Sequence, residues 1–221
     1  MTKAITMAQV DQPEPRWQAI IALLAVAGIH LALPKELVVG PSWMLPSLVV
    51  VLLVPTVFAH RLGRHSLNHI LGIMICAIIT FGLIASVVLL VLTLPGKQEP
   101  APALLCSGGA LWLTNMLVFA LWYWRLDGGG PRERETQDEF GSCSFVFPQM
   151  QIEKTERKKF RVEGWRPGFV DYLFIAFTTS ATFGPTDAPI LTHWAKLITM
   201  AQGLISLTIM VLLISRAVGV L

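Results

Sequence analysis

Long apolar runs separated by short polar linkers make up most of this chain. Four of them precede residue 125 and a fifth closes the chain; they cover residues 17–33, 44–59, 67–94, 103–124 and 190–220. Proline, glycine or charged residues bound each run. A helix needs about 20 mostly apolar residues to cross the hydrocarbon core of a bilayer, and these runs approach or exceed that length. We therefore expect five membrane-spanning helices.

A sixth apolar segment, 170–183, is shorter and is followed by a polar turn. Its roughly 14 residues make about 21 Å of helix at ~1.5 Å per residue, less than the ~30 Å core of a bilayer. Its end is rich in hydroxyl groups, at Thr178, Thr179, Ser180 and Thr182. A short helix, a polar turn and a long helix in this order are typical of a re-entrant pore loop.

The pattern predicts an all-α, polytopic membrane protein with five transmembrane helices plus a re-entrant pore helix and loop. If the short segment crosses the membrane instead, the protein has six spans. The expected parts are a flexible tail (1–16), a four-helix transmembrane region (17–124), a polar loop or cap (125–168), and the pore helix, loop and final helix (169–221).

Composition agrees with this class. The chain is 54% hydrophobic and 14% charged, against about 25% charged residues in soluble domains. Nine of the 17 Lys and Arg lie in 125–166 among eight acids, a mixture typical of a solvated surface rather than a nucleic-acid site. The three histidines of 60–69 lack the carboxylate or cysteine of a usual ligand set. We predict neither a metal nor a cofactor, and no nucleic-acid partner.

Residues 171–221 resemble the pore region of two-transmembrane, tetrameric potassium channels. In that family a pore helix leads into a T-V-G-Y-G-D filter, and an inner helix follows. The matching stretch here is Thr182-Phe183-Gly184-Pro185-Thr186-Asp187, and Thr192-His-Trp-Ala-Lys-Leu197 matches the start of the inner helix. The resemblance implies a filter at 182–187 and inner-helix cavity or hinge residues at Gln202, Gly203 and Ser206. It also implies a homotetramer that passes monovalent cations across the lipid bilayer.

The filter-like stretch departs from the family pattern at two positions. Gly184 keeps the first filter glycine, but the second is Thr186, whose β-branched side chain is costly at positive φ. Pro185 replaces the tyrosine, and it has a fixed φ and no N–H. Because a potassium filter aims successive backbone carbonyls at the ion, we expect a pore without classical potassium selectivity.

Roughly the last hundred residues are also similar to bacterial inner-membrane proteins of uncharacterised function. They share an F-T followed shortly by P-T-D, and the F-P-Q-M found here at 147–150. This resemblance implies a bacterial inner-membrane location. It leaves open a six-span protein that does not conduct, such as a scaffold, a partner subunit or a small-solute carrier.

Basic residues and the resemblance disagree on topology. If four spans precede the loop, the tail, the 60–69 turn and the 125–167 loop share one side and carry thirteen Lys and Arg, against two in the other linkers. The positive-inside rule makes that side cytoplasmic, whereas a potassium-type pore loop enters from outside. The six-span alternative removes the conflict.

An enzyme is not expected. Asp171, Asp187 and His193 are the candidate acid–base set near the short segment 170–183. The two aspartates bracket this segment and are expected to lie far apart. Their spacing suggests no nucleophile, base and orienting group in reach of one another.

Overall fold

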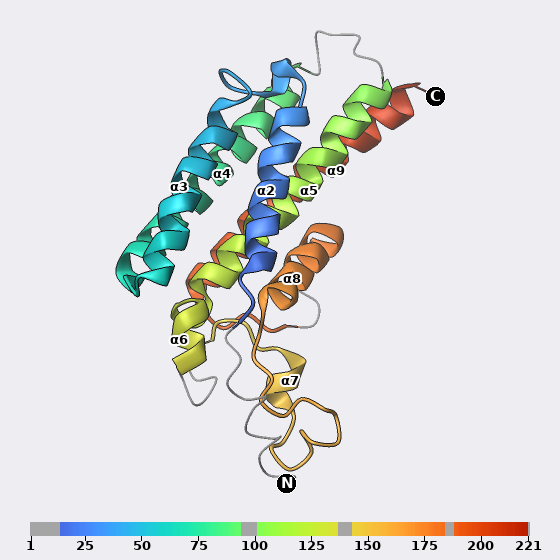
Figure 1. The fold of residues 1–221 in the computed structure, drawn as a ribbon. Helices are drawn as coiled ribbons and strands as arrows, with labels where there is room; N and C mark the ends of the chain where they lie inside the picture. Colours follow the sequence, from blue (N-terminus) through green and yellow to red (C-terminus); the bar gives the residue numbers. More distant parts are fainter. Residues whose placement is uncertain (1–13, 94–100, 137–142, 184–187, 221) are drawn as a thin grey trace.

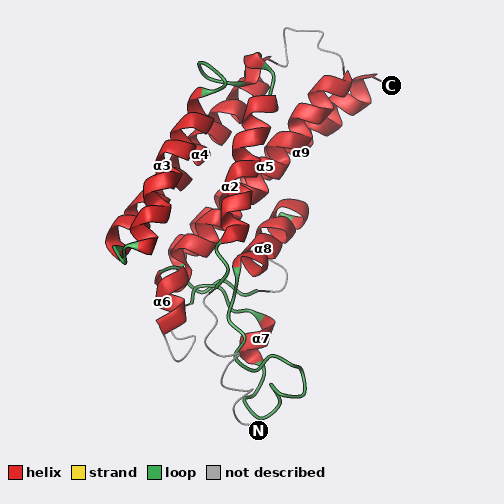
Figure 2. Ribbon diagram, viewed as in Figure 1, coloured by secondary structure: helices red, strands yellow, loops and turns green. Residues whose placement is uncertain are grey.

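The computed structural model describes residues 14–93, 101–136, 143–183 and 188–220 (Figure 1). Within these ranges the chain is helical, as predicted, and Figure 2 shows no strand in them. The long helices are α2 (Trp17–Ala32), α3 (Met44–Arg61), α4 (His65–Thr93), α5 (Ala101–Leu126) and α9 (His193–Val220). The short ones are η1 (Lys35–Leu37), η2 (Asp127–Gly129), α6 (Pro131–Thr136), α7 (Pro148–Gln151) and α8 (Phe169–Thr182).

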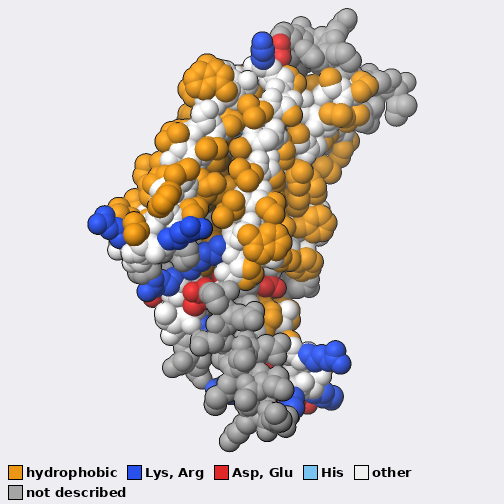
Figure 3. All heavy atoms as spheres, viewed as in Figure 1, with side chains coloured by type: hydrophobic (Ala, Val, Ile, Leu, Met, Phe, Trp, Pro, Cys, Tyr) orange, Lys and Arg blue, Asp and Glu red, His pale blue; other side chains and the backbone are white. Residues whose placement is uncertain are grey.

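Three helices are long and apolar enough to cross a membrane, over Ser66–Leu92, Pro102–Gly129 and His193–Ser215. The apolar helices α2, α3 and α8 are shorter. In Figure 3 the apolar side chains cover the long helical body, while charged side chains gather at the end where α6 lies. We call this end the loop end. These features indicate a membrane protein.

Helix α5 occupies the centre of the fold and contacts α2, α4, α8 and α9 (Figure 1). Four consecutive residues of α5, 118–121, are at most 4% exposed, as expected of a helix that is apolar on all sides. Helices α3 and α4 form an antiparallel pair beside it. The interior is thus built around one helix with neighbours on most of its faces.

Three consecutive glycines end α5. Gly128, Gly129 and Gly130 have φ values of +58°, +79° and +98°, a backbone conformation that glycine adopts without the steric cost of a Cβ atom. Pro131 then begins α6, a favourable first helical position for proline. This break turns the chain out of α5 into the polar segment, residues 125–168, at the loop end.

Helix α8 begins at the loop end, and the residues that precede α9 lie at the loop end again. Its carboxyl end lies beside the middle of α9, since Phe183 O is 3.7 Å from the position that a Cβ on Gly203 would take. Residues 189–191 pair with the polar segment at the loop end: Val146 N donates to Pro189 O (3.0 Å) and Leu191 N to Ser144 O (2.8 Å). Phe145 and Ile190 form an isolated antiparallel bridge.

This pairing corrects one predicted boundary. The last helix was expected from residue 190, but α9 begins at His193. Residues 189–191 are extended because their backbone groups bond to residues 144–146 rather than within a helix. The short segment matches its expected bounds, as α8 runs from Phe169 to Thr182.

Candidate functional site

A cluster of polar side chains lies in the interior where α5, α8 and α9 meet. Its members, which we call the polar network, are Trp112, Asn115 and Tyr123 of α5, Ser180 of α8, and Gln202 and Ser206 of α9. All but Trp112 are buried, with at most 1% of their surface exposed. Burying polar groups in an apolar interior is costly unless they are hydrogen-bonded, so these contacts decide how the three helices fit together.

Gln202 connects all three helices through its side-chain amide. Its Nε2 donates to the Ala176 carbonyl (2.7 Å) and to Ser180 Oγ (2.8 Å), both in α8. Its Oε1 accepts a short hydrogen bond from the Tyr123 hydroxyl of α5. Both amide donors and the carbonyl oxygen therefore have partners, and Gln202 holds the half-length helix α8 in one register against α9.

Two backbone carbonyls, those of Ser180 and Gln202, accept further hydrogen bonds from side chains. Ser206 Oγ donates to Ser180 O (2.7 Å), and the Trp112 indole N–H donates to Ser206 Oγ (3.0 Å). Asn115 Nδ2 donates to Gln202 O at 3.3 Å. The last turn of α8 leaves carbonyls without helical partners, and this one is satisfied by side chains from α5 and α9. Asn115 therefore bonds from α5 across to α9.

Two buried oxygens at this junction have no hydrogen-bond partner among the described residues. They are Asn115 Oδ1 and Thr179 Oγ1, and both residues are fully buried. Such acceptors suit a water molecule or a cation. Unused acceptor capacity therefore remains beside the polar network, next to the end of α8.

A second polar cluster fixes the beginning of α8 at the loop end. The fully buried carboxylate of Asp127 accepts from the Tyr172 hydroxyl (2.7 Å) through one oxygen and from the Ser144 backbone N–H (2.5 Å) through the other. The guanidinium carbon of Arg134 lies 4.9 Å from the centre of the Tyr172 ring. This cluster joins the end of α5, the polar segment and α8.

Arg134 also ties the N-terminal residues to this cluster. It donates to the carbonyls of Trp124 (2.9 Å) and Asp127 (2.6 Å), and pairs with Glu14 at 3.3 Å. The Glu14 carboxylate accepts from the Trp124 indole N–H at 2.5 Å. Burial raises the pKa of Glu14 above its ordinary value, and the nearby Arg134 guanidinium offsets only part of that rise.

The filter-like residues are described in part. Thr182 and Phe183 lie at the end of α8 with exposed side chains, and Phe183 caps the helix at φ +59°, in the left-handed region. The positions predicted at Gly184, Pro185, Thr186 and Asp187 lie outside the described residues.

The predicted inner-helix residues are described in full. Gln202, Gly203 and Ser206 are buried, and they face α5 and α8 of their own chain rather than an open cavity.

The hydroxyl groups of α8 differ in their partners, and Thr179 Oγ1 has none among the described residues. Thr178 donates to the Phe174 carbonyl (3.1 Å) and Thr182 to the Thr178 carbonyl (2.7 Å), the local bonding that such residues often form in membrane helices. Ser180 instead belongs to the polar network.

Sequence reasoning missed the Asp127 cluster and the roles of Trp112 and Tyr123. Asp127 and Arg134 flank a glycine-rich helix break, and acidic and basic residues at such a break are ordinarily solvated. The residue that could have revealed this cluster is Tyr172, one of two tyrosines in the chain, at the start of the short segment 170–183. Tyrosine hydroxyls seek a partner when buried.

None of the described residues form a group of three or more His, Cys, Asp or Glu able to hold a metal ion. No protein-family model matches the chain, and neither a curated protein nor a solved structure matches it.

Proposed function

We propose that this chain is a pore-loop cation channel of the bacterial inner membrane, with five spans and α8 as a re-entrant half-helix. The observation that carries the proposal is the path of the chain around α8. The helix starts at the loop end, stops beside the middle of α9, and is followed by residues 189–191 at the loop end again. The pairing of Ser144 with Leu191 favours this arrangement over a sixth crossing.

The end of α8 suits a cation pathway electrostatically. A helix carries about half a negative charge at its carboxyl end, and half-helices that stop inside a membrane use this end to stabilise cations. Thr182 and Phe183 extend from this end with exposed side chains. Residues 182–187 would line the pathway, with Asp187 concentrating cations at its mouth.

The pathway would form between chains. Gln202, Ser206 and Ser180 are hydrogen-bonded within one chain, so they support the position of α8 instead of lining the pore. A ring of several loops about one axis is needed, and the resemblance to potassium channels implies four. Pro185 and Thr186 favour a pore that does not select potassium in the usual way.

Helix α9 presents a regular apolar stripe for such an assembly. Its members, Leu197, Met200, Leu204, Leu207, Val211 and Ile214, are 42–66% exposed. Their spacing alternates between three and four residues, the repeat by which helices pack along a common seam. The stripe supports self-association along α9, the helix that follows the loop.

The charge distribution supports a cytoplasmic loop end. That end carries the 62–64 turn, the start of α2 and the polar segment, which together hold most of the Lys and Arg. By the positive-inside rule, the loop would enter from the cytoplasm. This orientation is opposite to that of the potassium channels that residues 171–221 resemble.

Cation flux into liposomes containing the purified full-length protein tests the proposal. We expect flux of monovalent cations, and a several-fold reduction for Asp187→Asn at low ionic strength that shrinks as salt screens the charge. Glu163→Gln also converts a carboxylate to an amide, on an exposed residue of the polar segment, and should leave flux unchanged. An assembled oligomer without flux at any voltage or pH would contradict the proposal.

The hydrogen bonding of the polar network within one chain also favours a second candidate, a membrane protein that does not conduct. A scaffold, partner subunit or small-solute carrier needs α8 only as a packing element, and Gln202 satisfies its groups inside one chain. Absence of flux from an intact oligomer would support this candidate.

A further inference from the structure

Arg125 is a buried cation in an apolar surrounding. Only 8% of its surface is exposed, and its guanidinium donates to the backbone carbonyl (2.7 Å) and side-chain carbonyl (3.2 Å) of Asn68. Among the described residues it forms no ion pair with a carboxylate. Its guanidinium carbon also lies 5.9 Å from the centre of the Trp124 ring. A buried charge held by neutral groups is costly, so an anion bound beside Arg125 would offset that cost.

The packing of α4 is shaped around this guanidinium. A Cβ on Gly72 would lie 1.4 Å from Arg125 Nη2. Any larger residue at this position would therefore clash with the guanidinium. Asn68, one turn earlier on α4, is itself oriented by a bond from Nδ2 to the Thr56 carbonyl of α3 (2.9 Å). The buried cation is therefore a built feature of the interface between α3, α4 and α5.

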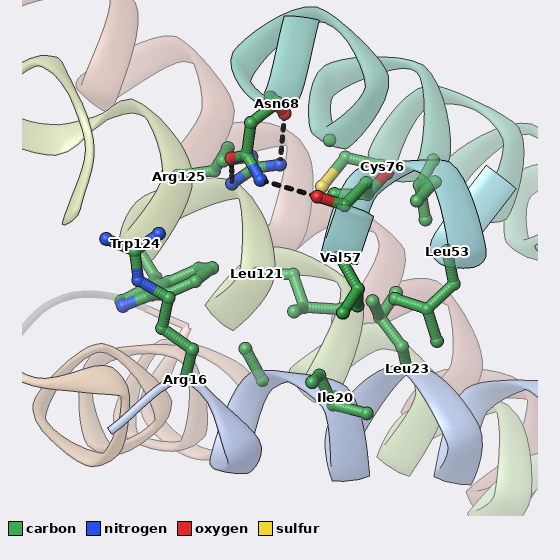
Figure 4. Close-up of a pocket in the computed structure, with 14 residues that line it drawn as sticks. Arg16, Ile20, Leu23, Leu53, Val57, Asn68, Cys76, Leu121, Trp124 and Arg125 are labelled. Carbon is green, nitrogen blue, oxygen red and sulfur yellow. Dashed lines mark hydrogen bonds between the residues drawn. The ribbon is translucent and has the colours of Figure 1, made fainter. Parts of the chain in front are cut away.

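An apolar cavity of about 120 Å³ adjoins Arg125, between α2, α3, α4 and α5. Figure 4 shows Ile20, Leu23, Leu53, Val57 and Leu121 on one side of it, with Arg125 and Asn68 at the other. A cavity of roughly 150 Å³ with apolar walls takes up one benzene molecule. This cavity therefore has room for a short stretch of hydrocarbon chain.

On the polar side of Arg125 lies a second, larger hollow of about 360 Å³. Its charged and titratable lining comprises Arg16, Arg125, Arg132, His69 and Glu133. Glu135 pairs with Arg16 at 3.6 Å, so positive charge still exceeds negative charge across the hollow. Arg16, Asn68 and Arg125 line both spaces, which makes one site with a basic end and an apolar end.

We propose that this site binds an anionic phospholipid, with the phosphate between Arg125 and Arg132 and part of one acyl chain in the apolar cavity. The site lies at the loop end of α5 next to Trp124, where charged side chains begin on the surface (Figure 3). Basic pockets between membrane helices suit lipid headgroups. The proposal does not depend on whether the protein conducts.

Thermal unfolding of the full-length protein in a neutral detergent tests it, together with native mass spectrometry of bound lipid. Phosphatidylglycerol should raise the midpoint temperature and remain bound, while phosphatidylcholine should do neither. Arg132→Gln, on an exposed side chain, should raise the phosphatidylglycerol concentration for half-maximal binding about fivefold, the effect of one basic residue at an anionic membrane surface.

Two further variants separate the possible ligands. Ala19→Phe fills the apolar cavity that Ala19 lines and should abolish lipid binding. Arg64→Gln, an exposed arginine at the same end but outside the site, should change nothing. Equal binding of phosphatidylcholine, or an equal loss in Arg64→Gln, would overturn the proposal. Stabilisation by inorganic phosphate that persists in Ala19→Phe would show a free-anion site and overturn the assignment to lipid.

Discussion

The side-chain amide of Gln202 in α9 donates a hydrogen bond of 2.8 Å to the hydroxyl of Ser180 in α8. Both side chains are at most 1% exposed, and the bond lies near the end of a helix that stops within the interior. The position of α8 is therefore held by polar contacts at its carboxyl end as well as by packing along its length.

Replacing Gln202 by leucine should lower the free energy of unfolding by about 1–3 kcal/mol, because Ser180 Oγ and the Tyr123 hydroxyl would lose a buried partner. Unfolding in mixed micelles measures this change. Thr208→Val is the matched control on α9, since Thr208 is exposed and bonds only to its own helix at Leu204 O (2.8 Å). A loss no larger than in this control would show that the network does not hold α8.

Adjacent glycines of α5 provide a test of close helix packing. A Cβ on Gly108 would lie 2.3 Å from Leu213 Cδ2 of α9, whereas one on Gly109 would have no atom within 4 Å. Gly108→Ala should therefore be less stable than Gly109→Ala by about 1–3 kcal/mol, the usual cost of overpacking. Equal stabilities in the same unfolding assay would mean that α5 and α9 are not in this contact.

The bond between Tyr172 and Asp127 should control the start of α8. Tyr172→Phe removes a hydroxyl that donates to a fully buried carboxylate oxygen of Asp127, which we expect to cost about 1–3 kcal/mol. Hydrogen exchange of residues 169–176 should become faster. Phe174→Leu, at an exposed position of the same helix, serves as the control and should leave exchange nearly unchanged.

Cys143 should react slowly with thiol reagents at neutral pH. Burial, with the Asp127 carboxylate adding to the effect, raises the pKa of this thiol to about 11. The thiolate is the reactive form, so the alkylation rate should rise about tenfold per pH unit from pH 7 to 9 without levelling off. Peptide mass spectrometry follows the site. A plateau below pH 9 in the folded protein would contradict this environment.

The helices themselves were largely predictable from local pattern. Apolar runs bounded by proline and charged residues predicted α2 and α3 to within two residues at either end. The bounds of these helices are set by residues close in the sequence, so a local pattern is enough to predict them. The helix break at 128–130 also has a local cause, because its three glycines adopt the positive φ values that the break requires.

The contacts that position α8 were not predictable in the same way. Asp127 and Tyr172 are 45 residues apart in the chain, and no local signal tells which polar group a buried tyrosine will meet. The late start of α9 has a similar cause, since residues 189–191 bond to 144–146. The helices could be predicted, but the contacts between residues far apart in the sequence, which make the site, could not.

The re-entrant path of α8 is the central claim, and sidedness of cysteine labelling tests it most directly. Single cysteines replace Glu163, Leu191 and Glu36 in a variant lacking the three native cysteines; all three positions are exposed. An impermeant thiol reagent is applied to one membrane face at a time. We predict that Glu163→Cys and Leu191→Cys are labelled from the same face and Glu36→Cys from the other. Labelling of Leu191→Cys from the face that labels Glu36→Cys would show that α8 crosses the membrane.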